Sequence, residues 1–328
     1  MKYLVCALLL SSAARAFADP AAEPRPLTLD SKVALGTVLG RIDHLAVDVT
    51  RQRLYVAELG NNSVAVVDLK ERRLLRRLPG FRQPQGIAYE PSTDTVYVTN
   101  AGDGSVRILH GEDLTSAGTI ELGEDADNIR IDMSSNRVLV GYGNGGVAVI
   151  DPVRRQKTAD IRLQAHPESF QLEPHAGRIL ANVPQAHEIA LLDPATARQT
   201  NTWPTNNLRA NFPLAIDAER QRVLVMFRHP ATLAAYRLRD GVMTQAVPAC
   251  SDADDLFVDP KRSLIYSSCG EGFVEVFAMR AQGLVRVTRL ATAPGARTSL
   301  WVPQFDRLYV AVRATQQPAA IWILRPPG

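Results

Sequence analysis

A segment of roughly 42 residues recurs seven times along this chain of 328 residues. Each copy pairs a short apolar run, usually closed by an acidic residue, with a turn and a second apolar run. The copies begin at residues 44, 86, 128, 169, 213, 255 and 299, so consecutive copies start 41 to 44 residues apart. Periods of 20 to 50 residues are typical of solenoids and propellers, so this spacing constrains the fold more than any local motif.

The stretch TVYVTNAGDGSVRIL, residues 95–109, indicates how one copy folds. Val96 and Val98 alternate with polar residues, as do Val106 and Ile108 beyond the glycines, which is the pattern of a β-hairpin. Most copies continue with a third apolar strand and a more polar fourth. Four antiparallel strands per repeat form one blade, so we predict an all-β, seven-bladed β-propeller.

The two ends of the chain predict how the ring closes. The seventh copy stops after AIWILRPPG, residues 320–328, and contains three strands. Residues 30–40, DSKVALGTVLG, precede the first copy and belong to no blade. An unpaired edge strand invites aggregation, so we predict that residues 32–39 complete the last blade and that the propeller domain spans residues 30–328.

One short signature places the chain near a known family. Residues 97–100 read Tyr-Val-Thr-Asn, and LYVAELGNNSVAVVD from residue 54 follows the same register. The chain therefore resembles the YVTN-type β-propeller repeat family of exported bacterial seven-bladed propellers, over residues 30–328. The middle copies depart from the signature, with RILANV, RVLVMF and SLIYSS in its place. The resemblance implies the fold and does not assign an activity.

The amino terminus has the pattern of an export signal. A lysine, an apolar run and Ala-Phe-Ala fill residues 1–18, which we interpret as a signal peptide cut before Asp19. Residues 19–29 are rich in proline and are expected to form a flexible leader. We therefore expect a periplasmic or secreted protein, with no transmembrane segment in the mature chain.

The charge balance argues against nucleic acid as a partner. Lys and Arg number 37 and Asp and Glu number 34, which gives a net charge of +3. The basic run KERRLLRR at residues 70–77 is interpreted as a solvated outer strand. The expected partners are a small polar ligand or another envelope protein, and the chain is expected to be a monomer.

Polar residues gather where the first strand of each copy begins, and in a propeller these strands line the central channel. Because the first two strands of a blade are antiparallel, the end of the second lies beside the start of the first. The entry positions are Asp43-His44, Gln85-Gly86, Asp127-Asn128, Glu168-Ser169, Phe212-Pro213, Asp254-Asp255 and Thr298-Ser299. The exit positions and their loops supply Glu58, Asn100, Tyr142, His187, Arg228, His229 and Arg313.

Two interpretations of the entry positions remain open. Carboxylates and an imidazole that converge suit a divalent cation in the channel, with Asp43, His44, Asp127, Glu168 and Asp254 as the metal ligands. Alternatively, the short polar residues cap turns and solvate a water-filled mouth. The predicted ligand-binding set is Asp43, His44, Glu58, Asn100, Asp127, Asn128, Glu168, His187, Arg228, Asp254 and Arg297.

The arginines and the other histidines near the channel mouth bear on these two interpretations. Arg228, Arg297 and Arg313 are expected to face the acidic positions, which suits a ligand carrying both charges or a site that neutralises itself. His166 and His229, each followed by proline, are assigned structural or hydrated roles in loops. The sequence lacks the Gly-x-Ser-x-Gly, His-Glu-x-x-His and Cys-x-x-Cys-His motifs.

Three functions follow from this pattern. The favoured one is a binding or scaffold propeller that holds a small polar ligand, a cation or a protein at the channel face. The second is a metal-dependent hydrolase resembling the six-bladed gluconolactonase-like propellers, with Glu58, Asn128 and Asp254 as substitutes for their metal ligands. The third is a propeller lyase of the streptogramin type, in which His187 would act as the acid-base group. Whether the chain is an enzyme stays open.

Two cysteines remain after the expected signal cleavage. Cys250 precedes the entry of the sixth copy and Cys269 follows the exit of its second strand, so antiparallel pairing brings them to the same end of one blade. An oxidising compartment and an even count favour a disulfide between them. Two unpaired buried thiols are the alternative.

Overall fold

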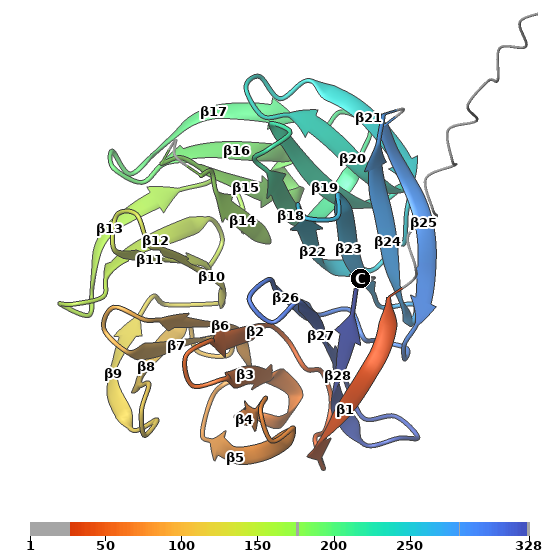
Figure 1. Ribbon diagram of the computed structural model, residues 1–328. Helices are drawn as coiled ribbons and strands as arrows, with labels where there is room; N and C mark the ends of the chain where they lie inside the picture. The colour runs from red at the N-terminus through yellow and green to blue at the C-terminus, as the bar shows by residue number, and fades with distance from the viewer. Residues whose placement is uncertain (1–26, 175–176, 282, 327–328) are drawn as a thin grey trace, which may run out of the picture.

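The computed structural model describes residues 27–174, 177–281 and 283–326, and they form a ring of seven four-stranded antiparallel sheets (Figure 1). Each copy predicted from the sequence begins within four residues of the first strand of a blade. Two short 3-10 turns, η1 (Leu59–Asn61) and η2 (Pro184–Ala186), each lie between the second and third strands of a blade. The predicted seven-bladed propeller is therefore confirmed. In the described part of the chain, no helix is long and apolar enough to cross a membrane.

The strands follow one another outwards from the channel in six of the seven blades. Blade 1 consists of β2 (Leu45–Asp48), β3 (Arg53–Glu58), β4 (Ser63–Asp68) and β5 (Arg73–Pro79). Blade 2 consists of β6 (Pro84–Glu90), β7 (Thr95–Asn100), β8 (Ser105–His110) and β9 (Ser116–Glu121). Blade 3 consists of β10 (Ala126–Asp132), β11 (Arg137–Tyr142), β12 (Gly146–Asp151) and β13 (Gln156–Arg162). Blade 4 consists of β14 (Ser169–Leu172), β15 (Ile179–Val183), β16 (Glu188–Asp193) and β17 (Arg198–Pro204). Blade 5 consists of β18 (Arg209–Asp217), β19 (Arg222–His229), β20 (Ala231–Arg237) and β21 (Met243–Pro248). Blade 6 consists of β22 (Ala253–Asp259), β23 (Leu264–Cys269), β24 (Phe273–Arg280) and β25 (Gly283–Ala291).

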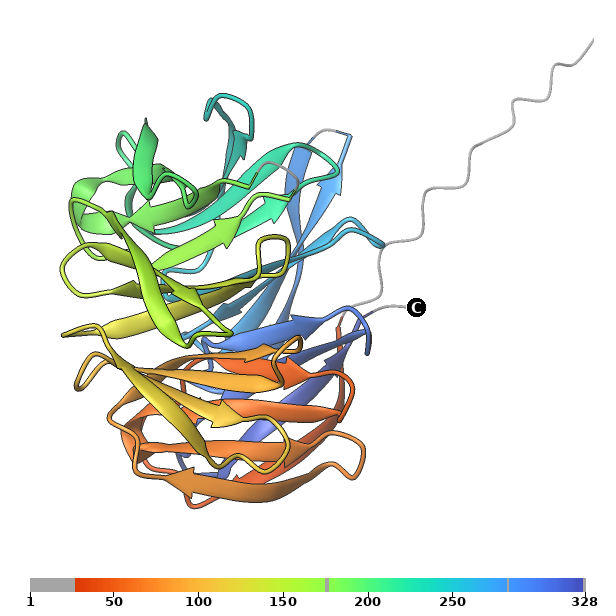
Figure 2. The same ribbon diagram turned by 90° about the vertical axis from the view of Figure 1, so that its left-hand side faces the viewer.

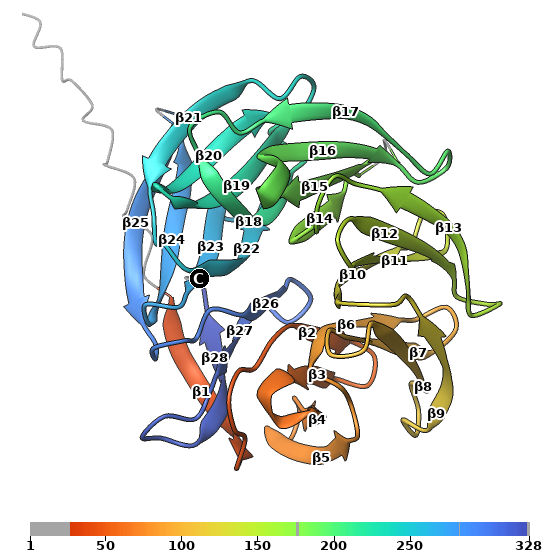
Figure 3. The same ribbon diagram turned by 180° about the vertical axis from the view of Figure 1, so that it is seen from behind.

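Blade 7 is built from both ends of the chain. Its strands are β26 (Ser299–Val302), β27 (Arg307–Val312), β28 (Ala319–Arg325) and β1 (Thr28–Gly36), and β1 lies beside β28 in both face views of the ring (Figures 1 and 3). The register places Val33 opposite Ile321. The N-terminal strand therefore closes the ring as predicted, although it begins at Thr28 and ends at Gly36, whose φ of 73° turns the chain out of the strand.

The predicted boundaries at the amino terminus shift slightly. Thr28 and Leu29, which were assigned to the leader, belong to β1, and the side chain of Leu27 is buried between blades 6 and 7. The predicted signal peptide, residues 1–18, and most of the leader lie outside the described residues. Residues 73–77 of the basic run lie on β5, the outermost strand of blade 1, in agreement with its interpretation as a solvated edge.

The core lies between neighbouring blades rather than inside one sheet. The second and third strands are buried on both faces, which explains why they are apolar over their whole length instead of alternating. Between blades 1 and 2, for example, Tyr55 and Val66 pack with Ile87 and Val98. The seven sheets are packed face to face around the ring, as the side view shows (Figure 2). This packing fixes the innermost strands and thereby the channel that they line.

Candidate functional site

The entry segments of the blades enclose a polar cavity of about 270 Å³ at one mouth of the channel. We call it the mouth cavity. Bulges interrupt the pairing between the first two strands at the entry positions of blades 2, 3, 5 and 6. Such bulges redirect side chains away from the regular ladder. The cavity is lined by Arg41, His44, Gln85, Asp125, Asp127, Asn128, His166, Glu168, Phe212, Arg228, Asp254 and Arg297.

Side chains of preceding blades hold these entry segments in place. Thr99 Oγ1 on β7 donates to the carbonyl oxygen of Asp127 at 2.5 Å, and Asn182 Nδ2 on β15 donates to that of Phe212 at 2.9 Å. Both donors are buried, so each bond is made out of reach of bulk water. The backbone at the mouth is therefore fixed by the second strands, and the entry side chains remain directed at the cavity.

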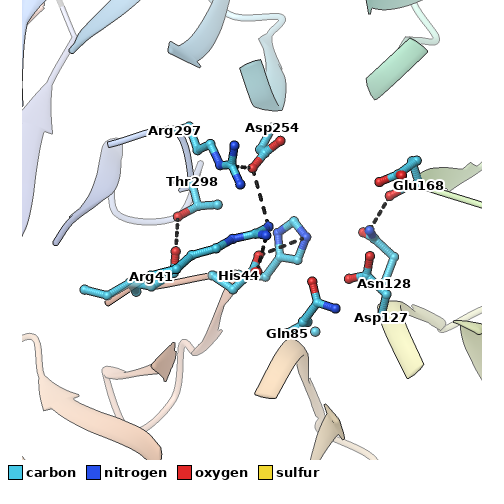
Figure 4. Close-up of polar contacts among 12 residues, drawn as sticks. Arg41, His44, Gln85, Asp127, Asn128, Glu168, Asp254, Arg297 and Thr298 are labelled. Atoms are coloured by element: carbon cyan, nitrogen blue, oxygen red, sulfur yellow. Dashed lines mark hydrogen bonds and ion pairs between the residues drawn. The ribbon is translucent and has the colours of Figure 1, made fainter. Parts of the chain in front are cut away.

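Arginines from three blades surround one carboxylate on one side of the cavity. Arg228 Nη2 lies 2.5 Å from Asp254 Oδ1, and Arg297 Nε lies 2.6 Å from Asp254 Oδ2. Arg41 Nη2 lies 3.7 Å from the same Oδ2, and Asp252 contacts Arg297 Nη1 at 2.9 Å. We call Arg41, Arg228 and Arg297 the arginine cluster; Figure 4 shows Arg41 and Arg297 beside Asp254.

The arginine cluster retains hydrogen-bond donors for a further partner. A guanidinium carries five N–H donors. Within the described residues, the Nη1 groups of Arg41 and Arg228 and the Nη2 group of Arg297 donate no hydrogen bond. Phe212 supports Arg228 from one side, with the guanidinium carbon 3.5 Å from the ring centre. The cluster can therefore accept an anionic group from the cavity without breaking its own ion pairs.

Acidic and amide side chains occupy the opposite side of the mouth cavity (Figure 4). Among the described residues, the carboxylate of Glu168 accepts no hydrogen bond and forms no ion pair. Burial, together with repulsion from Asp127, raises the pKa of Glu168 to about 7. Asn128 donates from Nδ2 to the Glu168 carbonyl, and its buried Oδ1 has no partner within the described part of the chain. This side of the cavity thus offers the carboxylate of Glu168 and the amide oxygen of Asn128 as unpaired acceptors.

His166 links the acidic side to the loop of blade 3. Its Nδ1 lies 2.6 Å from the Gly143 carbonyl oxygen and its Nε2 lies 3.6 Å from Asp127 Oδ2. Burial alone would lower the pKa of His166, but Asp127, the Gly143 carbonyl and Asp125 raise it to about 9. The imidazole is therefore cationic at neutral pH: Nδ1 donates to the Gly143 carbonyl, and the charge beside Asp127 partly neutralises that carboxylate.

His44 lines the mouth cavity, and Asp43 lies directly behind it. His44 Nε2 lies 3.7 Å from Asp43 Oδ1, and its Nδ1 lies 3.7 Å from Asp255 Oδ1. Burial lowers the pKa of His44, yet Asp255 and Asp43 raise it further than burial lowers it. Burial raises the pKa of Asp43, although Arg41 Nη2 lies 2.8 Å from its Oδ2. Asp43 is fully buried, so it supports His44 and Arg41 from behind.

The structure brings most of the predicted ligand-binding residues together at this mouth. His44, Asp127, Asn128, Glu168, Arg228, Asp254 and Arg297 line the cavity, and Asp43 lies directly behind it. Three residues of the predicted ligand-binding set do not line the cavity: they are Glu58, Asn100 and His187. Arg313, expected to face the acidic positions, is exposed and also lies outside the cavity lining.

Glu58, Asn100 and His187 have structural roles within the blades instead. Glu58 is buried and bonded to Arg77 Nε at 2.7 Å, and Asn100 Oδ1 accepts from the Arg82 N–H at 3.0 Å. His187 is exposed in the turn after η2, with a φ of 57°. Glu58 and Asn100 end second strands, one strand away from the channel, and their side chains turn into the blade or its loops, whereas Arg228, near the end of β19, reaches the cavity.

Sequence reasoning missed three residues of the cavity. Arg41, Asp125 and His166 each precede an acidic entry position, Asp43, Asp127 or Glu168, by two residues. His166 had been assigned to a loop role. All three lie just before the first strand of a blade, in irregular segments, and Asp125 has a φ of 41°, so no strand period marks the direction of their side chains.

The predicted metal ligands do not gather into a coordination group. Among the described residues, one set of three Cys, His, Asp or Glu side chains has its ligand atoms within 4.8 Å of one another, and it consists of Cys250, Cys269 and Glu275. Both cysteines are oxidised, because a disulfide joins them with a Cα–Cα distance of 6.1 Å. The predicted disulfide is confirmed. It lies directly before the segment that carries Asp252 and Asp254, and thus anchors that segment to β23.

Comparison with known proteins supports the fold and does not assign an activity. No protein-family model and no curated protein sequence matches the chain. A solved chain of Kuenenia stuttgartiensis hydrazine synthase is similar, with a TM-score of 0.76 and 16% identity over 88% of this chain and 97% of that one. A chain in a crystal structure of the mitotic checkpoint complex gives 0.79 and 13% over 98% and 99%. At such identities the likeness concerns the propeller fold alone.

Proposed function

We propose that this chain is an exported β-propeller binding protein that holds a small zwitterionic ligand in the mouth cavity. The carboxylate of the ligand pairs with the free donors of the arginine cluster, and its ammonium group pairs with Glu168 and Asp127. The observation that carries the proposal is the carboxylate of Glu168. It is half-buried and forms no ion pair in the described structure, while unused guanidinium donors lie across the same cavity.

Two further parts of this proposal concern family and location. We infer membership of the YVTN-type repeat family, supported by the Tyr-Val-Thr-Asn sequence on β7 and by the seven blades. We infer export to the periplasm or medium, supported by the signal-like residues 1–18 and by the disulfide between Cys250 and Cys269.

The geometry favours ligand binding over the two enzymatic alternatives. A metal-dependent hydrolase requires several ligand atoms around one ion, and among the described residues no group of three includes Glu58 or Asp254. A lyase that used His187 would need that imidazole at the cavity, whereas it is exposed in a turn outside the lining. Each carboxylate beside the arginine cluster is already paired with a guanidinium, which further disfavours a divalent cation.

Isothermal titration calorimetry on the chain tests the proposal. The probes are glycine, β-alanine, 4-aminobutyrate and 6-aminohexanoate, with butyrate and butylamine as analogues that carry one charge. We expect one of the amino acids to bind at least about tenfold more tightly than both analogues, because it satisfies both sides of the cavity. Equal affinity for butyrate and the amino acids, or no saturable heat with any of them, would contradict the proposal.

A further inference from the structure

A second cavity of about 350 Å³ follows the innermost strands beyond the mouth cavity, and His44 lines both. We call it the inner chamber. Six first strands contribute to its wall, which is mostly apolar. It is lined by His44, Leu45, Ala46, Val47, Gly86, Ile87, Ala88, Tyr89, Ile129, Arg130, Ile131, Gln171, Asp255, Phe257, Ser299 and Leu300.

The charged side chains of this wall are His44, Arg130 and Asp255. Asp255 is already engaged, because its Oδ2 accepts the Ser299 N–H at 2.8 Å and its Oδ1 lies 3.7 Å from His44 Nδ1. The single carboxylate of the wall therefore serves blade 7 and His44. It does not form an ion pair with Arg130 across the chamber.

Arg130 is the group that this arrangement leaves without a counter-ion. Its Nη1 donates to the carbonyl of the neighbouring Ile129 at 2.7 Å. Within residues 27–174, 177–281 and 283–326, it makes no other hydrogen bond and no ion pair. Burial lowers the pKa of Arg130 further than the charges of Asp255 and Asp127 raise it. Arg130 is half-buried, and a guanidinium with several unused donors at a cavity wall favours an anion or water as its partner.

We propose that the inner chamber binds a small carboxylate with an apolar body, whose carboxylate group pairs with Arg130. The planar guanidinium fork matches the two carboxylate oxygens. The apolar body packs against Ile87, Phe257 and Leu300, from blades 2, 6 and 7. This site differs from the mouth cavity in its chemistry, because it offers one cationic end and an apolar wall in place of two opposed charges.

Calorimetry with benzoate and its neutral analogue benzyl alcohol tests the proposal on the chain. We expect benzoate to bind in a saturable one-to-one manner and the alcohol to bind at least about tenfold more weakly. The Arg130→Gln variant should lose at least that factor for benzoate. Arg53→Gln is the matched control, because Arg53 lies outside the chamber and donates to the carbonyls of Gly111 and Glu112. Unchanged benzoate affinity in Arg130→Gln, or equal affinity for the alcohol, would overturn the proposal.

A second variant tests the proposal even if Arg130→Gln does not fold. Gln171 lines the chamber and makes no side-chain hydrogen bond in the described structure, so Gln171→Trp should fill the space without touching Arg130. We expect this variant to keep its melting temperature and to lose benzoate binding. Retained binding would place benzoate elsewhere and overturn the assignment. Amino-acid binding at the mouth cavity depends on Glu168 and is measured in a separate titration, so either proposal can fail without the other.

Discussion

Arg228 Nη2 lies 2.5 Å from Asp254 Oδ1, a contact that joins β19 of blade 5 to β22 of blade 6. The same carboxylate reaches Arg297, before blade 7, and Arg41, before blade 1. One acidic side chain therefore connects four blades at the mouth. Its removal should affect both the stability of the ring and the charge of the cavity.

Asp254→Asn should destabilise the protein by roughly 2 kcal/mol, because three guanidiniums lose a shared partner. The cost stays below that of a fully buried pair, since Arg228 and Arg297 keep 20% and 24% of their side-chain exposure. Urea unfolding measures the change. The control is Asp240→Asn, whose partners Arg237 and Arg239 are exposed, and it should leave the midpoint unchanged. Equal effects of the two substitutions would show that Asp254 does not connect the four blades.

His166 predicts a pH dependence of stability. Its pKa is raised from 6.5 to about 9 in the folded protein. A raised pKa means that the folded state binds the proton more tightly, so the gain is complete below pH 6.5 and is lost as the pH rises to about 9. The loss amounts to at most about 3 kcal/mol. His166→Gln should flatten the unfolding free energy across this window, whereas His110→Gln, at an exposed position, should not.

An NMR titration of the imidazole checks the same prediction directly. The ring signals of His166 should shift with a midpoint well above 6.5, because Asp127 and the Gly143 carbonyl hold the charged form. A midpoint at or below 6.5 would contradict the assignment of a cationic imidazole to the cavity wall.

The N-terminal strand should be required for a closed ring. A chain that begins at Arg41 lacks Val33 and Leu35, both fully buried against blade 7, and leaves β28 as an unpaired edge. Such a chain should unfold with lower cooperativity and aggregate. A chain that begins at residue 27 keeps β1 and serves as the control. Identical melting and solubility of the two chains would argue against closure by β1.

The disulfide should stabilise the sixth blade. Cys250 and Cys269 are 19 residues apart, and a bridge over a loop of this size contributes on the order of 3 kcal/mol. The Cys250→Ala, Cys269→Ala double variant should lose about this amount, with a drop in melting temperature. Thiol titration of the denatured, unreduced chain from residue 27 onwards should detect no free thiol, and two free thiols would contradict the bridge.

The fold could be predicted because its signal is redundant. Seven copies of one strand pattern, with a spacing of 41 to 44 residues, leave few architectures, and the missing strand of the seventh copy identifies β1 as its complement. The place of the cavity followed from the same alignment, since the first strands line the channel. Neither inference required knowledge of any side-chain contact.

The composition of the site was harder to predict because it depends on side-chain direction. Glu58 and Asn100 end second strands, and their side chains turn to Arg77 and to the Arg82 amide rather than to the channel. Conversely, Arg41 and His166 precede the first strands in irregular segments, where no period marks their direction. Strand periodicity predicts which face a residue occupies, and it does not extend into the loops that complete the cavity.

The most direct test of the account is the preference of the mouth cavity for two charges over one. It is measured by calorimetry at pH 8, above the pKa of about 7 that burial gives Glu168. The measurement compares 4-aminobutyrate with butyrate on the unmodified chain and on Glu168→Gln. We expect a clear preference for the amino acid on the unmodified chain and its loss in the variant, with butyrate affinity unchanged. A preference that persists in Glu168→Gln, or no preference on the unmodified chain, would contradict the assignment of this cavity to a zwitterionic ligand.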